Sequence, residues 1–155
     1  MKTVVQRVTR AEVRVAGELV GKIERGLVLL VGVEKGDGEA DADATVRKIA
    51  ALRIFPNRTP MDVTAADVGG ACLVISQFTL CATLAKGNRP SFEPAEAPAR
   101  AEALYLRVAD GLRAAGLTVE TGRFGADMQV ELVNDGPVTF IVAVRGGRLV
   151  EVPPR

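Results

Sequence analysis

Two apolar runs constrain the fold more than any other feature: GLVLLVGV at residues 26–33 and ACLVISQFTL at residues 71–80. Apolar residues occupy successive positions in these runs, which predicts strands that are buried on both faces. Such strands need cover on both sides, so we expect them inside a sheet. A chain of 155 residues can supply that cover, since it is long enough to bury a sizeable core.

Further elements follow from periodicity and turn signals. The stretch from Thr3 to Val15 turns at Ala16-Gly17 into Leu19–Ile23, which predicts a hairpin. Apolar residues at helical spacing predict a helix from about Glu39 to Leu52. A second helix is predicted to begin at Pro98 and to end before Gly116, where a glycine cap belongs.

The remainder of the chain predicts four more strands, LTVETGRF, DMQVELV, VTFIVAV and RLVEV. Two main helices among strands that are mostly joined by hairpins indicate an α+β fold with antiparallel or mixed β-sheets. We expect a single domain over residues 1–155, in which residues 145–155 form an extra C-terminal hairpin or tail.

Composition limits the partners and the compartment. The chain is 48% hydrophobic and 25% charged, with no apolar run near the length of a membrane span and no signal-peptide pattern at its start. We therefore expect a cytoplasmic protein without a membrane partner. The formal net charge of +1 predicts no general attraction to nucleic acid, so DNA is not expected and an RNA would have to be held locally.

The chain contains no histidine, and this limits its chemistry. A Ser-His-Asp or Cys-His arrangement cannot be built without an imidazole. Cys72 and Cys81 lack the paired spacing of a zinc site, so neither a metal nor a cofactor is expected. A hydrolase built from this chain would depend on positioning and on backbone hydrogen-bond donors.

Four stretches carry polar groups that have both a functional and a plain structural interpretation: SQFTL, KGNRPSF, GRFGADM and NDGP. The first places Ser76, Gln77 and Thr79 at the end of an apolar strand, where they either face a ligand or satisfy a neighbouring loop. The second lies in a loop of the length that is often functional, and the last is also ordinary turn chemistry. Pro137 nevertheless lies between two apolar runs that both read as strands, where a residue without an N–H is unexpected.

Taken together, the motifs resemble one family. In order along the chain they are QRVTRAEV at 6–13, GLVLLVGVEKGD at 26–37, SQFTL at 76–80, KGNRPSF at 86–92, TGRFGADMQV at 121–130 and NDGPVTF at 134–140. Their order and spacing make the chain similar to the D-aminoacyl-tRNA deacylases, which remove D-amino acids from tRNA. The resemblance runs from Met1 to about Val144.

The resemblance implies a homodimer whose Gly136-Pro137 bond is cis and enters the pocket of the other subunit. The sequence itself leaves the isomer open. By the same resemblance, Arg7 would support the Gly-Pro bend, while Phe124 and Met128 would line an adenine pocket. An L side chain would then collide with main chain while a D side chain would not, and glycine, with no side chain, would also be accepted.

For the reaction, the resemblance implies help from the 2′-hydroxyl of the terminal adenosine and an oxyanion held by the N–H groups of Phe78 and Thr79, beside Ser76 and Gln77. Many bacterial relatives carry a threonine where this chain has Leu84, with Thr83 one position early, so a threonine nucleophile is not expected.

Two other functions remain open from the sequence. One is a non-catalytic editing accessory that binds tRNA ends, and the other is a small-molecule esterase that uses Ser76 or a cysteine. The tail offers Arg145, Arg148 and Arg155 either as contacts to tRNA phosphates or as part of a solvated edge.

Overall fold

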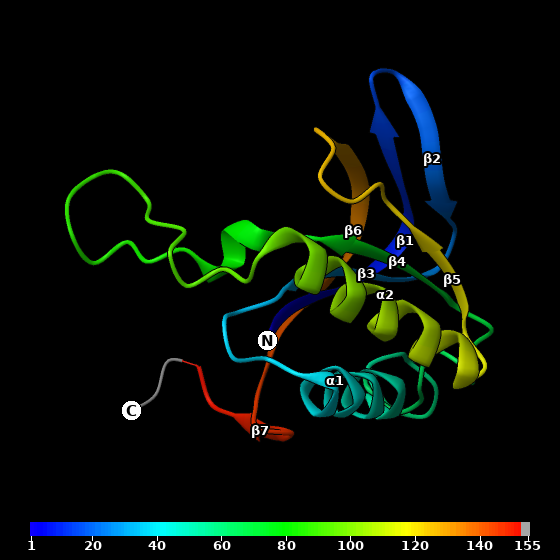
Figure 1. Ribbon diagram of the computed structural model, residues 1–155. Helices are drawn as coiled ribbons and strands as arrows, with labels where there is room; N and C mark the ends of the chain where they lie inside the picture. The colour runs from blue at the N-terminus through cyan, green and yellow to red at the C-terminus, as the bar shows by residue number, and fades with distance from the viewer. Residues whose placement is uncertain (153–155) are drawn as a thin grey trace.

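The computed structural model describes residues 1–152 and contains one 7-stranded sheet with the order β5-β4-β3-β1-β6-β7, in which β2 pairs with β1 (Figure 1). The β3–β4 and β4–β5 pairs are parallel and the others are antiparallel, so the expected mixed sheet is confirmed. The strands are β1 (Lys2–Val15), β2 (Glu18–Ile23), β3 (Gly26–Gly32), β4 (Ala71–Ser76), β5 (Thr118–Thr121), β6 (Gln129–Arg145) and β7 (Arg148–Val150).

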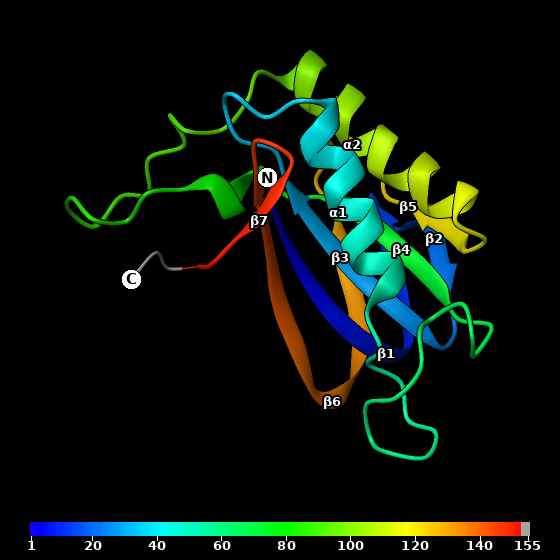
Figure 2. The ribbon, with the colours of Figure 1, turned by 90° about the horizontal axis from the view of Figure 1, so that it is seen from below.

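Two helices, α1 (Glu39–Ala51) and α2 (Pro98–Ala114), lie side by side over one face of the sheet (Figure 2). Both predicted helices are confirmed, and α1 ends one residue earlier than expected. Pro98 occupies the first turn of α2, and Gly116 has a φ of +91°, as a glycine that ends a helix requires. Within residues 1–152, neither helix is long and apolar enough to cross a membrane.

The central strands are buried on both faces, as their apolar runs predicted. Leu27, Leu29 and Val74 pack into the core between the sheet and the helices. Their neighbours Val28 and Leu73 point the other way, into a second cluster formed with β1 and β2. Because β2 also contacts β4 and β5, the β1–β2 hairpin covers this second cluster.

Two predicted boundaries were wrong. The strand predicted to reach Leu80 ends at Ser76, and a short 3₁₀ helix, η1 (Phe78–Cys81), follows it. The two strands predicted on either side of Pro137 are one strand, β6. The reason is β1, which is 14 residues long and pairs with both halves of β6.

The unexpected proline lies where β6 leaves this pairing. Gln6 pairs with Thr139 and Val8 pairs with Asn134, so residues 135–138 face Arg7 alone. A residue without an N–H is tolerated at such a bulge because no ladder hydrogen bond is required there. The Gly136-Pro137 bond is cis, as the resemblance implied.

At the C-terminal end, β7 pairs antiparallel with the end of β6 and forms an edge hairpin. Arg145 lies 3.8 Å from the Glu34 carboxylate, whereas Arg148 lies in exposed β7. Arg155 lies outside the described residues.

Candidate functional site

A cavity of about 460 Å³ opens at the end of β4. Three segments form most of its walls: the chain from Ile75 to Phe78, the loop from Phe124 to Met128, and the beginning of α2 with the residues before it. Val33 and Val130 complete the lining. Of the residues singled out in the sequence, Ser76, Gln77, Phe78, Phe124 and Met128 line this cavity. The fold therefore brings two motifs that are distant in the sequence to one place.

The chain changes direction at the wall formed by β4. The Gln77 N–H donates to the Val31 carbonyl at 2.7 Å, after which the chain turns into η1. Thr79 does not line the cavity, but its hydroxyl accepts a hydrogen bond of 2.6 Å from the Gln77 side-chain amide. Within residues 1–152, no backbone carbonyl accepts from the N–H of Phe78 or Thr79, as is usual in the first turn of a helix.

An aromatic contact supports the opposite wall. The Phe124 and Tyr105 rings lie 6.1 Å apart, and the Tyr105 hydroxyl donates to the Val74 carbonyl at 3.1 Å. A Cβ atom at Gly122 would lie 2.7 Å from the Met128 sulfur, so glycine there gives Met128 room to pack. Sequence reasoning missed Tyr105, whose position in α2 gave no signal except its place among apolar residues.

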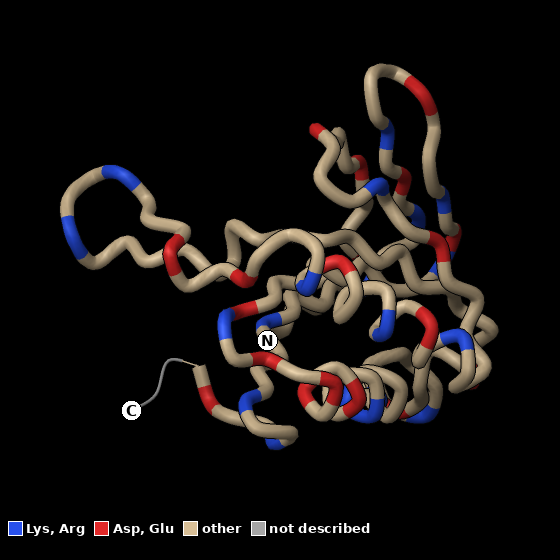
Figure 3. Tube along the Cα trace, in the orientation of Figure 1, with Lys and Arg blue, Asp and Glu red and all other residues tan. Residues whose placement is uncertain are grey.

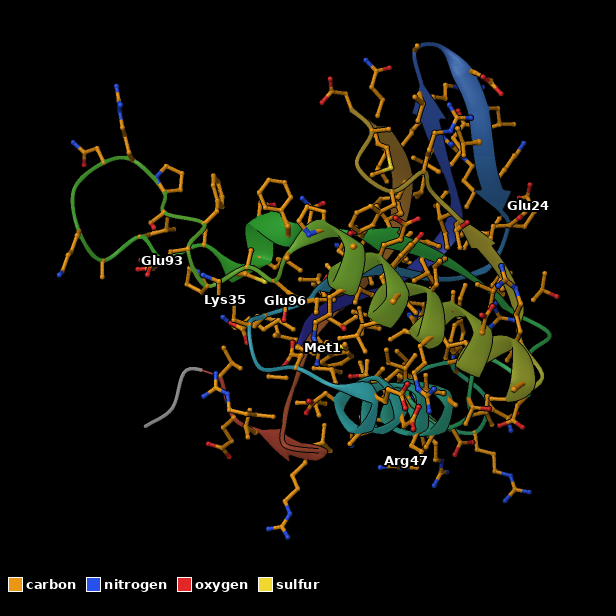
Figure 4. The ribbon with its side chains drawn as sticks, in the orientation of Figure 1. Met1, Glu24, Lys35, Arg47, Glu93 and Glu96 are labelled. Carbon is orange, nitrogen blue, oxygen red and sulfur yellow. The ribbon has the colours of Figure 1, made fainter. Side chains whose placement is uncertain are left out.

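Two carboxylates also line the cavity, and neither was named from the sequence, although Asp127 lies within the GRFGADM stretch. Glu96 accepts a hydrogen bond of 2.7 Å from the Ala97 N–H and lies 3.3 Å from Arg100 (Figure 4). Asp127 is exposed. No Lys or Arg within residues 1–152 belongs to the lining, so the cavity presents apolar groups, main chain and negative charge.

Neither cysteine lines the cavity, and burial keeps both thiols protonated near neutral pH. Burial raises the pKa of the Cys72 thiol to about 12. Burial, assisted by the nearby Glu34 carboxylate, raises the pKa of the Cys81 thiol to about 11. Because the thiolate is the reactive form, both side chains are inert at pH 7. Within residues 1–152, His, Cys, Asp and Glu side chains form no group of three that could hold a metal ion.

The remaining predicted residues lie at the β1–β6 bulge and not at the cavity of their own chain. Gly136 and Pro137 are exposed there, while the Arg7 side chain beneath them is largely buried. The Arg7 Nε donates to the Asp135 carbonyl at 3.1 Å and lies 3.0 Å from the Asp135 carboxylate. Its Nη1 donates to the Ile54 carbonyl at 2.6 Å.

The asparagine before the bulge holds it from the other side. The Asn134 side-chain amide donates to the carbonyls of Arg7 and Val138, at 2.9 and 3.2 Å. A Cβ atom at Gly136 would lie 2.6 Å from the Asn134 side-chain oxygen, so a larger residue would displace the side chain that makes these two hydrogen bonds. Hydrogen bonds therefore fix residues 134–138 in place of a strand ladder.

Comparison with known proteins identifies the family. The model of the D-Tyr-tRNA(Tyr) deacylase family matches residues 4–143, which is most of the chain. The chain belongs to this family. A D-aminoacyl-tRNA deacylase of Paracoccus denitrificans is 56% identical over 141 residues, covering 90% of this chain and 95% of the relative. A protein of the same name from Anaeromyxobacter dehalogenans is 56% identical over 146 residues, covering 94% and 98%.

Two solved structures have folds similar to that of this chain. A structure titled c-Myc DNA Unwinding Element Binding Protein has a TM-score of 0.87 and 39% identity, and covers 94% of this chain and 99% of its own. A second, described as a probable eukaryotic D-amino acid tRNA deacylase, has a TM-score of 0.77 at 16% identity and covers 90% and 97%. The second likeness shows the fold alone.

Proposed function

We propose that the protein hydrolyses the ester bond of D-aminoacyl-tRNA, and also of glycyl-tRNA, releasing the free amino acid and tRNA. The single observation that carries this proposal is the family match over residues 4–143. The geometry agrees with it, since a strand end whose N–H groups have no backbone acceptor among residues 1–152 borders a cavity of about 460 Å³, the size of small-molecule sites.

Main chain and substrate would carry out the chemistry. The terminal adenosine would occupy the cavity against Phe124 and Met128, and the N–H groups of Phe78 and Thr79 would stabilise the oxyanion. Removing one such donor typically costs about 3 to 4 kcal/mol of transition-state stabilisation, so a few fixed amides suffice for an activated ester. Ser76 and Gln77 would orient the ester, while the 2′-hydroxyl of the adenosine assists the attack.

Selection between enantiomers would require a second copy of the chain. Gly136 and Pro137 do not line the cavity of their own chain, and they belong to β6, a strand that presents several exposed apolar side chains. Of these, Ile141 is 59% exposed and Phe140 is 38% exposed. Exposed apolar residues gathered on one strand are typical of subunit interfaces. We infer a homodimer in which each bulge blocks L side chains in the partner's cavity.

A paired deacylation assay tests the function directly. Purified protein is incubated with D-tyrosyl-tRNA and, separately, with L-tyrosyl-tRNA, and the remaining ester is followed over time. We expect rapid loss of the D-ester and little loss of the L-ester beyond the rate without enzyme. Binding of both tRNAs without hydrolysis would replace the proposal with that of a non-catalytic accessory.

One further substrate and one variant distinguish the possible mechanisms. A D-tyrosyl-tRNA that ends in 2′-deoxyadenosine, charged at the 3′-hydroxyl, should bind but not turn over. Ser76→Ala should reduce the rate without abolishing it, because Ser76 is not the nucleophile. Complete loss in Ser76→Ala, with turnover of simple esters by the unmodified protein, would instead indicate a serine esterase.

A further inference from the structure

The loop from Thr83 to Phe92, called here the 83–92 loop, stands away from the body of the molecule (Figure 1). Its base is closed by two backbone hydrogen bonds between Thr83 and Ser91, of 2.9 and 3.0 Å. Every residue of the loop is exposed, and the proposed hydrolysis gives none of them a role. The closed base sets the direction in which the loop projects.

The loop carries positive charge without a compensating carboxylate. Lys86 and Arg89 are its only charged residues, and both lie in its outer part (Figure 3). Within residues 1–152, neither side chain forms a salt bridge, whereas Arg100, Arg107 and Arg113 all do. Glu93 comes directly after the loop and lies near it (Figure 4), but within residues 1–152 it forms no salt bridge with Lys86 or Arg89. The loop therefore presents two solvated cations away from the otherwise nearly neutral chain.

An aromatic pair connects this loop to the cavity. The Phe92 ring lies edge-on to the Phe78 ring, with centroids 5.1 Å apart. Phe78 lines the cavity, and both side chains are exposed, at 55% for Phe78 and 39% for Phe92. Exposed aromatic faces beside a positive groove are the combination on which single-stranded nucleic acid stacks.

We propose that Phe92 and the 83–92 loop bind the unpaired nucleotides that precede the terminal adenosine of the tRNA. This inference rests on the proposed function, which places the terminal adenosine in the cavity. The next bases would stack near Phe92, while Lys86 and Arg89 neutralise the phosphates that lead away from it. The contact is to backbone and base faces, so it does not depend on sequence.

A second copy of the chain is the competing occupant of this loop. Leu84, which is 72% exposed, would suit a protein contact. Lys86, next to glycine in the outer part of the loop, favours RNA, because lysine is depleted in the cores of protein interfaces. Two neighbouring cations also suit a phosphate backbone. The oligomeric state of the variants decides between the two.

The test compares the double variant Lys86→Ala/Arg89→Ala with the control Arg47→Ala/Lys48→Ala. The control removes the same charges from an exposed part of α1, far from the loop, where neither side chain forms a salt bridge within residues 1–152 (Figure 4). Each protein is assayed on D-tyrosyl-tRNA and on 2′(3′)-O-D-tyrosyl-adenosine, which has no phosphates. Light scattering reports the oligomeric state.

We expect the loop variant to show a kcat/KM on tRNA that is about tenfold lower or more, and to keep its activity on the adenosine ester. A plot of the logarithm of its tRNA-binding constant against the logarithm of salt concentration should have a slope that is smaller in magnitude by about 0.7 for each phosphate that the loop no longer neutralises. The control should resemble the unmodified protein on both substrates. Equal decreases on both substrates, no decrease on tRNA, or a change of oligomeric state would overturn the inference.

Titration with uncharged tRNA separates this inference from the proposed function. If the unmodified protein hydrolyses neither ester, the proposed function fails. Weaker tRNA binding by the loop variant, with unchanged binding by the control, would still support the role of the loop. Hydrolysis that proceeds normally while both variants bind tRNA equally well would remove the loop inference and leave the function intact.

Discussion

The end of β4 and the β1–β6 bulge both interrupt the sheet, but in opposite ways. At the end of β4 the chain turns inward and forms a cavity from its own residues. At the bulge, Gly136 and Pro137 turn outward, and neither lines that cavity. The walls of a concave cavity can be built by backbone and apolar packing within one chain, whereas a projecting segment must be held by side chains because its ladder hydrogen bonds are missing.

The largest expected effect comes from removing the side chain that holds the bulge. Arg7→Ala loses hydrogen bonds to the carbonyls of Asp135 and Ile54 and leaves a cavity beneath residues 135–138. Hydrogen bonds from charged groups contribute about 1.5 to 3 kcal/mol each, so the free energy of unfolding should fall by about 3 kcal/mol. Urea unfolding measures this, and the deacylation assay should show at least a tenfold loss.

Arg10→Ala is the matched control on the same strand. Arg10 pairs with Glu131 at 2.8 Å, and both side chains are exposed. Exposed pairs contribute little, so we expect no measurable change in stability or activity. If Arg10→Ala and Arg7→Ala behaved alike, the bulge would not depend on buried hydrogen bonds, and the contrast between the two regions would lose its basis.

A smaller effect on stability, but a large one on assembly, is expected at the exposed face of β6 beside the bulge. Ile141→Asp places a carboxylate on this face, where burying it against a second copy would be costly. We expect light scattering to show a monomer, and activity to fall more than tenfold, because no partner bulge completes the site. The unfolding midpoint measured for the monomer should change little, since Ile141 is 59% exposed in one chain.

Leu106→Asp makes the same change at an exposed position of α2, where Leu106 is 41% exposed. This control should remain a dimer and stay active. A monomeric Ile141→Asp protein that kept full activity with unchanged selection for D-esters would show that one chain forms the whole site. The bulge would then have no role in a partner's cavity.

The sequence predicted some elements of the fold better than others. Both helices followed from periodicity and the two doubly buried strands from continuous apolar runs, because burial imposes a local pattern on residues such as Leu27 and Val28. The continuity of β6 through Pro137 could not be predicted in this way, since it depends on the length of β1. Local sequence cannot report which partner strand is available.

The same limit applies to the candidate site. Phe124 and Met128 were named only through resemblance to a family, and Glu96 was not named at all. Nothing in the sequence around Arg7 distinguishes it from Arg10, although one is largely buried and the other exposed. The difference arises from the carbonyls of Ile54 and Asp135, which are distant in sequence and meet Arg7 only in the folded chain.

The smallest expected effect concerns the thiol behind the end of β4. Burial raises the pKa of Cys81 from 9.0 to about 11, so between these values the unfolded chain has lost a proton that the folded chain retains. Stability therefore falls as pH rises through this range, by roughly 1 kcal/mol per pH unit. Cys81→Ala has no thiol to ionise at this position, so its stability lacks this pH dependence. The stability advantage of the unmodified protein over the variant should therefore shrink between pH 8 and pH 10.

Urea unfolding at the two pH values, under reducing conditions, measures that change, and the deacylation assay at pH 8 accompanies it. Because a neutral thiol is a poor nucleophile, Cys81→Ala should keep activity within about twofold. A stability difference that did not depend on pH would mean that Cys81 ionises as readily in the folded chain as in the unfolded one. If activity were lost as well, the end of β4 would contain a reactive side chain, and hydrolysis by main chain alone would no longer describe that region.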